Sequence, residues 1–169
     1  SSQVLGLLGF GNIARRVALR AKPFGYKVIA YDPWVKSWDF ALQGVEMVDS
    51  LKDLLQHSDA VSIHVSLGPT SRHMIGEDEL RLMKPSACLI NTSRGQVIVQ
   101  EALVRALKEG VIAGAALDVF ESEPLPPHDP LRNLENTILT PHLAWYTEQT
   151  QTRLRRAASK AVADALEGR

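Results

Sequence analysis

The sequence contains one cysteine, no excess of charge of either sign, and no apolar run near the ~20 residues needed to cross a bilayer. A single cysteine excludes an intrachain disulfide and is typical of a reducing compartment. Basic and acidic residues both number 19, so a formal net charge of zero favours neither nucleic acid nor an anionic membrane as partner. The sequence also lacks a basic N-terminal segment followed by a hydrophobic one, the pattern typical of a signal peptide. We therefore expect a cytoplasmic protein that binds a small molecule.

The cysteine, Cys88, lies in the apolar run ACLI, where a thiol packed in a core is expected rather than a reactive one. With 169 residues, of which 45% are hydrophobic, the chain is long enough for one domain with a substantial core. It has no initiator methionine, and its first strand is predicted to begin almost at once, at Val4. We therefore expect residues 1–169 to be a domain excised from a longer protein.

Apolar runs of strand length alternate along the chain with segments of helical periodicity. Strands are predicted over 4–8, 27–32, 45–48, 60–65, 87–92, 113–120 and 137–140, and helices over 12–24, 50–58, 76–84, 100–110 and 154–166. A loop containing Trp34 and Trp38 follows the second strand, and a proline-rich loop over 121–133 separates the last two. This alternation predicts right-handed crossovers and an α/β fold, a Rossmann-type doubly wound parallel sheet with helices covering both faces.

The helical segments carry apolar stripes that predict how they pack. The first has Ile13, Val17, Ala21 and Phe24 at helical spacing before Gly25, a plausible stop signal. The last repeats apolar residues from 154 to 166 at the same spacing, so it is expected to be one long surface helix packed on the sheet.

The segment GLLGFGNIARRV places two glycines between the first strand and the first helix. Gly9 lets the chain turn sharply, and Gly11 removes a side chain so that a pyrophosphate can approach the backbone at the helix N-terminus. Ala14 is small enough for the third position of this motif. Asp32 ends the second strand about 20 residues further on, as the dinucleotide fingerprint requires. A carboxylate there accepts hydrogen bonds from ribose hydroxyls and repels a 2′-phosphate, so NAD is favoured over NADP.

In the second half, polar residues follow apolar strands at points where a ligand would bind. Arg94 comes in INTSRG, Asp118 and Glu123 in ALDVFESEP, and His142 in LTPHLAW. Together with GFGNIARRVA, these motifs closely resemble the NAD-binding domain of the D-isomer-specific 2-hydroxyacid dehydrogenases. The resemblance covers nearly the whole chain. The ending PHLAWYTEQ and the ESEP loop look most like the subgroup of the C-terminal-binding protein corepressors and their bacterial dehydrogenase relatives.

The resemblance implies a mechanism. Arg94 would bind the substrate carboxylate and polarise its 2-oxo group, because a guanidinium forms two directed bonds to a planar carboxylate. His142 would give a proton to the carbonyl oxygen while NADH delivers a hydride to carbon. Glu123, the acid directly before proline, would bond the far nitrogen of the ring, fix its tautomer and favour its charged form.

The resemblance also implies a set of cofactor contacts. Asp118 would bind the nicotinamide carboxamide, Thr92 and Ser93 would line the same ring, and Trp145 would form an aromatic wall, with a core anchor as its alternative role. The remaining candidates for the cofactor site are Gly9, Phe10, Gly11, Asn12, Ile13, Asp32, Val65, Ser66 and Ser71. Contacts through Ser66 and Ser71 are the less typical ones, because many relatives carry proline and threonine there.

The remaining histidines do not form a recognisable site. His64 ends a predicted strand beside the expected cofactor cleft, where packing and ligand contact are both open. His57, His73 and His128 fall at a helix end or in loops, and their spacing predicts no metal site.

Three functions fit the sequence. The first is an NAD-dependent dehydrogenase that interconverts a small 2-oxo acid and a D-2-hydroxy acid, dimerising through this domain as the family does and completed by a substrate domain outside residues 1–169. The second is a corepressor-like scaffold that senses NAD with the same residues. The third, a domain of another Rossmann enzyme, is disfavoured by Asp32 together with the set of Arg94, Glu123 and His142.

Overall fold

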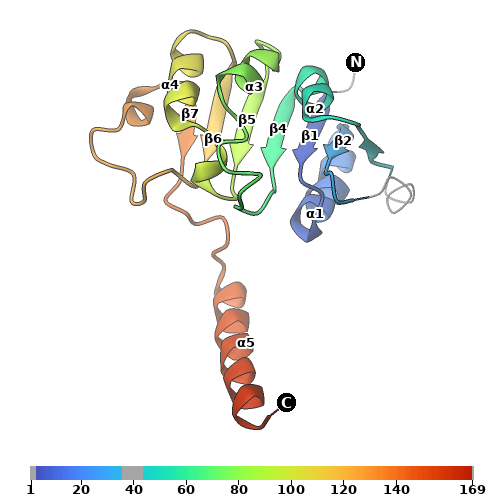
Figure 1. The fold of residues 1–169 in the computed structure, drawn as a ribbon, viewed down its shortest axis with the longest axis vertical. Coiled ribbons are helices and arrows are strands. Elements are labelled where there is room, and N and C mark those ends of the chain that lie inside the picture. The colour runs from blue at the N-terminus through green and yellow to red at the C-terminus, as the bar shows by residue number, and fades with distance from the viewer. Residues whose placement is uncertain (1–2, 36–43, 169) are drawn as a thin grey trace.

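The computed structural model describes residues 3–35 and 44–168, and within them seven parallel strands form one sheet in the order β3-β2-β1-β4-β5-β6-β7 (Figure 1). The strands are β1 Val4–Leu8, β2 Lys27–Tyr31, β3 Glu46–Met47, β4 Ala60–Ile63, β5 Cys88–Asn91, β6 Gly114–Leu117 and β7 Thr137–Leu139. The α-helices are α1 Asn12–Ala21, α2 Leu51–His57, α3 Glu77–Leu82, α4 Gln100–Lys108 and α5 Glu148–Leu166, and the short 3-10 helices are η1 Lys22–Phe24, η4 Gly95–Val97 and η5 Pro130–Asn133. The predicted Rossmann-type α/β fold is confirmed; the predicted loop residue Trp38 lies outside the described residues.

All strands are parallel, but the side of the sheet on which successive strands are added changes once, at the boundary between β1 and β4. Strands after β1 are added first on one side, to β2 and β3, and then on the other, from β4 to β7. In sheets of this kind the crossover loops diverge at this boundary and leave a crevice beyond the carboxyl ends of the strands. The fold therefore puts the loop after β1 and the loop after β4 on the two sides of one crevice.

Two apolar cores lie on the two faces of the sheet. Helices α2, α3 and α4 pack on one face, where Leu54, Leu80 and Leu103 are fully or almost fully buried. Helix α1 packs on the other face against β1 and β2, through Ala14 and Ala18. Helices thus lie on both faces, as predicted.

The packing face of α1 differs from the predicted one. Ile13 and Phe24 are 67% and 84% exposed, whereas Ala14, Ala18 and Ala21 are buried. Small side chains let the helix approach β1 closely, so the alanine stripe faces the sheet and the large apolar residues remain on its borders. Gly25 does end this segment, with a left-handed φ of 86°.

On the face that carries α1, no helix within residues 3–35 and 44–168 packs on the second half of the sheet. The register aligns Ile90, Ala116 and Ile138 across β5, β6 and β7, and Cys88 lies two residues before Ile90 on that face. Cys88 is exposed and Ile138 is 68% exposed. The expectation of a buried thiol was wrong, because the strand is apolar on both sides but only one side is covered by a described helix.

Helix α5 also departs from expectation. Its predicted helicity is confirmed, and the Thr147 hydroxyl caps it by accepting a hydrogen bond from the Thr150 N–H at 2.9 Å. The helix extends away from the sheet (Figure 1) and has no buried residue. Its apolar Val162 and Leu166 are 61% and 84% exposed. The prediction that it packs on the sheet was wrong, because periodicity reveals an apolar face but not what covers it.

Among residues 3–35 and 44–168, no helix combines the length and the apolar character required to span a membrane.

Candidate functional site

The conformation of the loop after β1 depends on Gly9, at a position that only glycine can occupy without strain. Its φ is 87°, and its N–H donates to the Tyr31 carbonyl at 2.9 Å. A Cβ on Gly9 would lie 3.0 Å from the backbone of both His64 and Val65. The loop therefore turns sharply against the end of β4, as the motif predicts.

Gly11 is a glycine for a different reason. It is the N-cap of α1 with an ordinary φ of −79°, and a Cβ there would meet no atom of the described chain within 4 Å. Neither the backbone nor packing requires a glycine at this position. In the part of the chain that the structure describes, no side chain caps α1, so its first N–H groups and the positive end of its dipole face the space beside Gly11. This arrangement fits a pyrophosphate.

Asp32 lies directly after β2, beside the glycine loop. Its Oδ2 accepts a hydrogen bond from the Phe10 N–H and its Oδ1 one from the Trp34 N–H, both at 2.9 Å. These bonds orient the carboxylate, and each oxygen retains acceptor capacity for a ribose hydroxyl. The Phe10 side chain is fully buried, so this predicted contact residue acts here through its backbone.

A cleft of about 330 Å³ joins the loops after β4 and β5 to the start of α1. Five of the predicted cofactor residues line it, namely Ile13, Val65, Ser66, Thr92 and Ser93. The predicted catalytic Arg94 lines it as well, together with His64 and Leu67. The Ser93 hydroxyl donates to the Val65 carbonyl at 2.9 Å and so ties the two loops together.

Ser71 lies outside this cleft lining. Its buried hydroxyl donates to the Ser66 carbonyl at 2.6 Å and accepts from the Gly68 N–H at 2.8 Å. In this structure it fixes the conformation of the loop that presents Ser66.

His64 contributes to the cleft and also packs. Burial lowers the pKa of its imidazole to about 4. Its Nε2 lies 3.0 Å from the Ser62 hydroxyl. The ring is therefore neutral near pH 7, and it adds polarity without charge to the cleft.

Glu123 and His142 form a close pair on the loops after β6 and β7. His142 Nδ1 lies 2.7 Å from Glu123 Oε2, and Glu123 Oε1 accepts the Phe120 N–H at 3.0 Å. Because a carboxylate only accepts, Nδ1 carries the proton of the neutral ring. Burial raises the pKa of Glu123, but hydrogen bonds from His142 and Phe120, with the charges of His142 and Arg94, outweigh burial and lower it.

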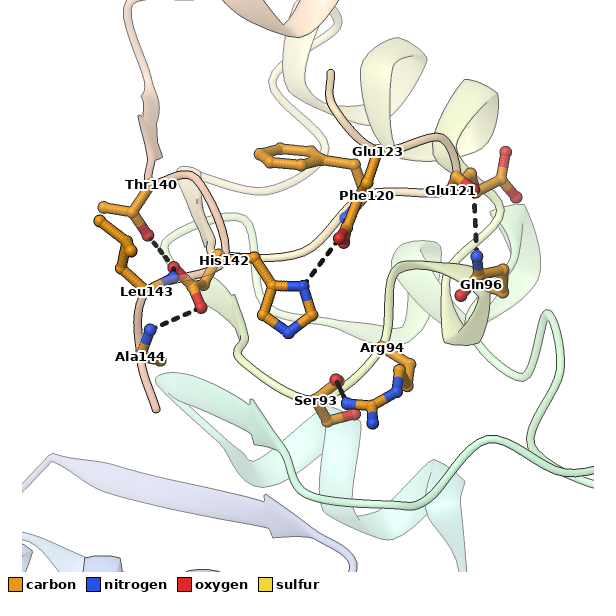
Figure 2. Close-up of polar contacts among 11 residues, drawn as sticks. Ser93, Arg94, Gln96, Phe120, Glu121, Glu123, Thr140, His142, Leu143 and Ala144 are labelled. Atoms are coloured by element: carbon orange, nitrogen blue, oxygen red, sulfur yellow. Dashed lines mark hydrogen bonds and ion pairs between the residues drawn. The ribbon is translucent and has the colours of Figure 1, made fainter. Parts of the chain in front are cut away.

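Figure 2 shows the second nitrogen of the His142 ring directed to the side on which Ser93 and Arg94 lie. Arg94 directly precedes η4, its carbonyl accepts from the Asn91 side chain at 2.9 Å, and its exposed guanidinium donates to the Ser93 carbonyl at 2.6 Å. Arg94 lines the cleft, and His142, from a loop almost 50 residues further along the chain, directs its second ring nitrogen to the side of this cation.

Asp118 has a structural task that the sequence did not reveal. It is buried, and its carboxylate accepts hydrogen bonds from the Leu143 and Ala144 N–H groups, each at 2.8 Å, and from the Thr140 hydroxyl. Burial raises the pKa of Asp118, yet these bonds and the charge of His142 lower it overall. The carboxylate therefore holds the backbone just after His142 and the Thr140 side chain just before it. His142 itself has a left-handed φ of 54°. Its contact with a carboxamide stays a prediction.

Trp145 is 47% exposed and packs edge-on against Tyr146, with ring centroids 5.5 Å apart. The alternative role as a core anchor is therefore wrong, and the aromatic wall stays a prediction. Within the described ranges, no group of three or more histidine, cysteine or acidic side chains is arranged to hold a metal ion.

Comparison with known proteins agrees with this geometry. The chain is 52% identical to the glyoxylate reductase of Korarchaeum cryptofilum over 153 residues, which cover 90% of this chain and 46% of that protein. It is 43% identical to the D-3-phosphoglycerate dehydrogenase of Methanocaldococcus jannaschii over 164 residues, 97% of this chain and 30% of that protein. The D-lactate dehydrogenase of Aquifex aeolicus, solved with NAD and lactic acid, superposes with a TM-score of 0.88 at 38% identity, over 98% of this chain and 54% of that one.

The chain thus spans less than half the length of these two curated relatives. The relatives are reductases and dehydrogenases, and membership of the corepressor subgroup stays a prediction. Residues 1–144 match the family described as the NAD-binding domain of the D-isomer specific 2-hydroxyacid dehydrogenases. This chain, with its glycine loop, its Asp32 and its Arg94, Glu123 and His142, belongs to that family and is an NAD-binding domain of it.

Proposed function

We propose that the complete protein is an NAD-dependent oxidoreductase that interconverts a small 2-oxo acid and a D-2-hydroxy acid. Residues 1–169 would be its NAD-binding domain, and a substrate domain outside them would close the site. The observation that carries the proposal is the Glu123–His142 pair at 2.7 Å, with the other ring nitrogen on the side of Arg94. The similarity to glyoxylate reductase and to D-lactate dehydrogenase supports a short substrate.

The cofactor would be held by residues that fit it. The α1 N-terminus and the open space at Gly11 suit the pyrophosphate, Asp32 suits the adenosine ribose, and Thr92 and Ser93 suit the nicotinamide end. When bound, NADH supplies the hydride for the substrate carbon.

Arg94 would bind the substrate carboxylate in a bidentate manner and place the 2-oxo group beside the nicotinamide. This requires the guanidinium to exchange its bond with the Ser93 carbonyl for the substrate, which its exposure permits.

His142 would hold a proton on Nε2 and donate it to the carbonyl oxygen of the substrate as reduction proceeds. Glu123 would balance the charge of the imidazolium and keep the ring oriented, since its other oxygen is anchored by the Phe120 N–H. In the oxidation direction the neutral ring would take the proton back from the hydroxyl.

The experiment is a panel of 2-oxo acids, including glyoxylate, pyruvate and 3-phosphohydroxypyruvate, assayed with the complete protein and NADH or NADPH. We expect reduction with NADH, a D-configured product from each prochiral acid, and weaker binding of NADPH because Asp32 repels its 2′-phosphate. A protein that binds NADH but reduces none of these acids would favour the NAD-sensing scaffold instead. Preference for NADPH would contradict the role given to Asp32.

A further inference from the structure

A second histidine–glutamate pair lies close to the first. His73 Nε2 is 2.9 Å from Glu121 Oε1, and both side chains are partly exposed, by 44% and 33%. Glu121 is two residues before Glu123, on the loop after β6. His73 comes from the loop after β4, so the pair links two loops that are 48 positions apart.

The same segment is held from a third loop. The Gln96 side-chain amide donates to the Glu121 carbonyl at 3.0 Å, and the Gln96 carbonyl accepts the His73 N–H at 2.8 Å (Figure 2 shows the first bond). Gln96 is in η4, two residues after Arg94. His73, Gln96 and Glu121 thus form a closed ring of three contacts, which we call the loop clamp.

The loop clamp acts at a point of close backbone contact. A Cβ on Gly95 would overlap the carbonyl of Phe120, so η4 lies directly against the Phe120–Glu121 backbone. The adjacent Phe120 N–H is the donor that anchors Glu123 Oε1. A shift of this backbone relative to η4 would therefore move the Glu123 carboxylate relative to Arg94.

His73 is held in an uncommon conformation for this contact. Its φ of 52° is left-handed. A residue with a Cβ is strained in this conformation, and the free-energy cost of the strain must be offset by contacts with the surrounding chain. Asparagine tolerates this conformation well but is too short to span to Glu121. It is therefore a suitable substitution for removing the side-chain contact while retaining the backbone.

We propose that His73 and Gln96 are positioning residues that fix the spacing between Arg94 and the Glu123–His142 pair. They touch no substrate; they hold the Phe120–Glu121 backbone against η4, so that cation and imidazole meet one substrate at the correct separation. The catalytic consequence rests on the proposed function, whereas the effect on the Glu123–His142 contact does not. Because a displacement of about 1 Å at a reacting centre can cost up to about 100-fold in rate, a modest shift has a measurable effect.

The first test uses His73→Asn and Gln96→Met in the complete protein, with His128→Asn and Gln56→Met as controls at exposed positions. We expect kcat for 2-oxo acid reduction to fall about ten-fold in the clamp variants, with affinity for NADH and melting temperature unchanged. The control variants keep the parent kcat. Parent kcat in the clamp variants of an active protein would overturn the proposal.

The second test needs no turnover. In the 169-residue chain labelled with 15N-histidine, long-range proton–nitrogen spectra above the titration range of histidine report which ring nitrogen of His142 is protonated. We expect the Nδ1–H form in the parent chain and a mixture of tautomers in both clamp variants, because Glu123 no longer meets Nδ1. An unchanged tautomer in the clamp variants would overturn the positioning proposal, whether or not the complete protein reduces a 2-oxo acid. Lack of 2-oxo acid reduction by the complete protein would refute only the proposed function.

Discussion

At the scale of single residues, two glycines two positions apart serve the chain and the ligand respectively. Gly9 is required by the fold, since its φ is 87° and a Cβ would press on the end of β4. Gly11 has an ordinary φ and open space around it. The difference separates a stability requirement from a binding requirement within one motif.

We therefore expect opposite phenotypes for the two alanine variants. Gly9→Ala should lower the free energy of unfolding by at least about 1–2 kcal/mol, the cost of a left-handed residue with a Cβ. Gly11→Ala should change it by less than about 1 kcal/mol but weaken NADH binding by on the order of ten-fold, or about 1.4 kcal/mol. Urea unfolding and NADH titration measure the two effects. Unaltered NADH affinity in Gly11→Ala would show that no pyrophosphate approaches this position.

The charge of Glu123 leads to a prediction about pH. Its pKa is lowered although burial acts to raise it, because His142, Phe120 and Arg94 favour the carboxylate. Coupling is reciprocal, so the carboxylate favours the imidazolium that 2-oxo acid reduction requires. Reduction consumes a proton held on the ring, so its rate falls on the alkaline side of the pH profile. Glu123→Gln should therefore move this alkaline limb to lower pH.

The measurement is the pH profile of kcat/KM in the complete protein, with Glu135→Gln, an exposed acid ahead of β7, as the matched control. The control should keep the parent profile. A Glu123→Gln profile with the parent alkaline limb would argue against the acid–base pair.

At the scale of elements, the two C-terminal elements, strand β7 and helix α5, contribute unequally to stability. Strand β7 pairs with β6 through three aligned residues, and Leu139 packs against the main core. Helix α5 buries none of its residues. Helix formation without a packed face contributes little to the stability of a domain.

Removal of residues 147–169 should therefore leave the melting temperature of the chain within about 2 °C, which corresponds to less than about 1 kcal/mol. The helical signal in circular dichroism should fall at the same time. Truncation after residue 136, which also removes β7, serves as the comparison and should destabilise the sheet. A large loss of stability on removing α5 alone would mean that the helix folds back onto the chain in solution.

At the scale of the whole molecule, cofactor binding and catalysis make different demands. The contacts proposed for NAD come from residues of this chain, whereas hydride transfer needs a closed site from which water is excluded. Arg94 is exposed and the side chain of His142 is 41% exposed, so this chain alone leaves the reacting groups open to water.

The 169-residue chain should thus bind NADH without turning over 2-oxo acids. NADH at about 100 times its dissociation constant stabilises a protein by roughly 2.7 kcal/mol through mass action. For a domain of this size that is a rise in melting temperature of roughly 5–10 °C. Calorimetry with NADH, and with NADPH for comparison, measures it. A melting temperature unchanged by NADH would contradict the prediction that this chain binds NADH. Rapid reduction of glyoxylate by the 169-residue chain would contradict the prediction that a second domain is required for catalysis.

The sequence by itself determined the fold class, the glycine loop, Asp32, and Arg94, Glu123 and His142 as candidates, because these depend on local periodicity and on motifs of fixed spacing. Only the tertiary structure decided what covers each apolar face. Cys88 was expected in the core and the last helix was expected to pack on the sheet, yet Cys88 is exposed and α5 has no buried residue, because an apolar stripe shows which face can pack but not what it packs against. The tertiary structure likewise revealed the loop clamp. His73 was expected only to lie outside any recognisable site, and Glu121 lies in the ALDVFESEP motif without an assigned role. Their contact exists only because parallel strands bring loops distant in sequence to one edge of the sheet.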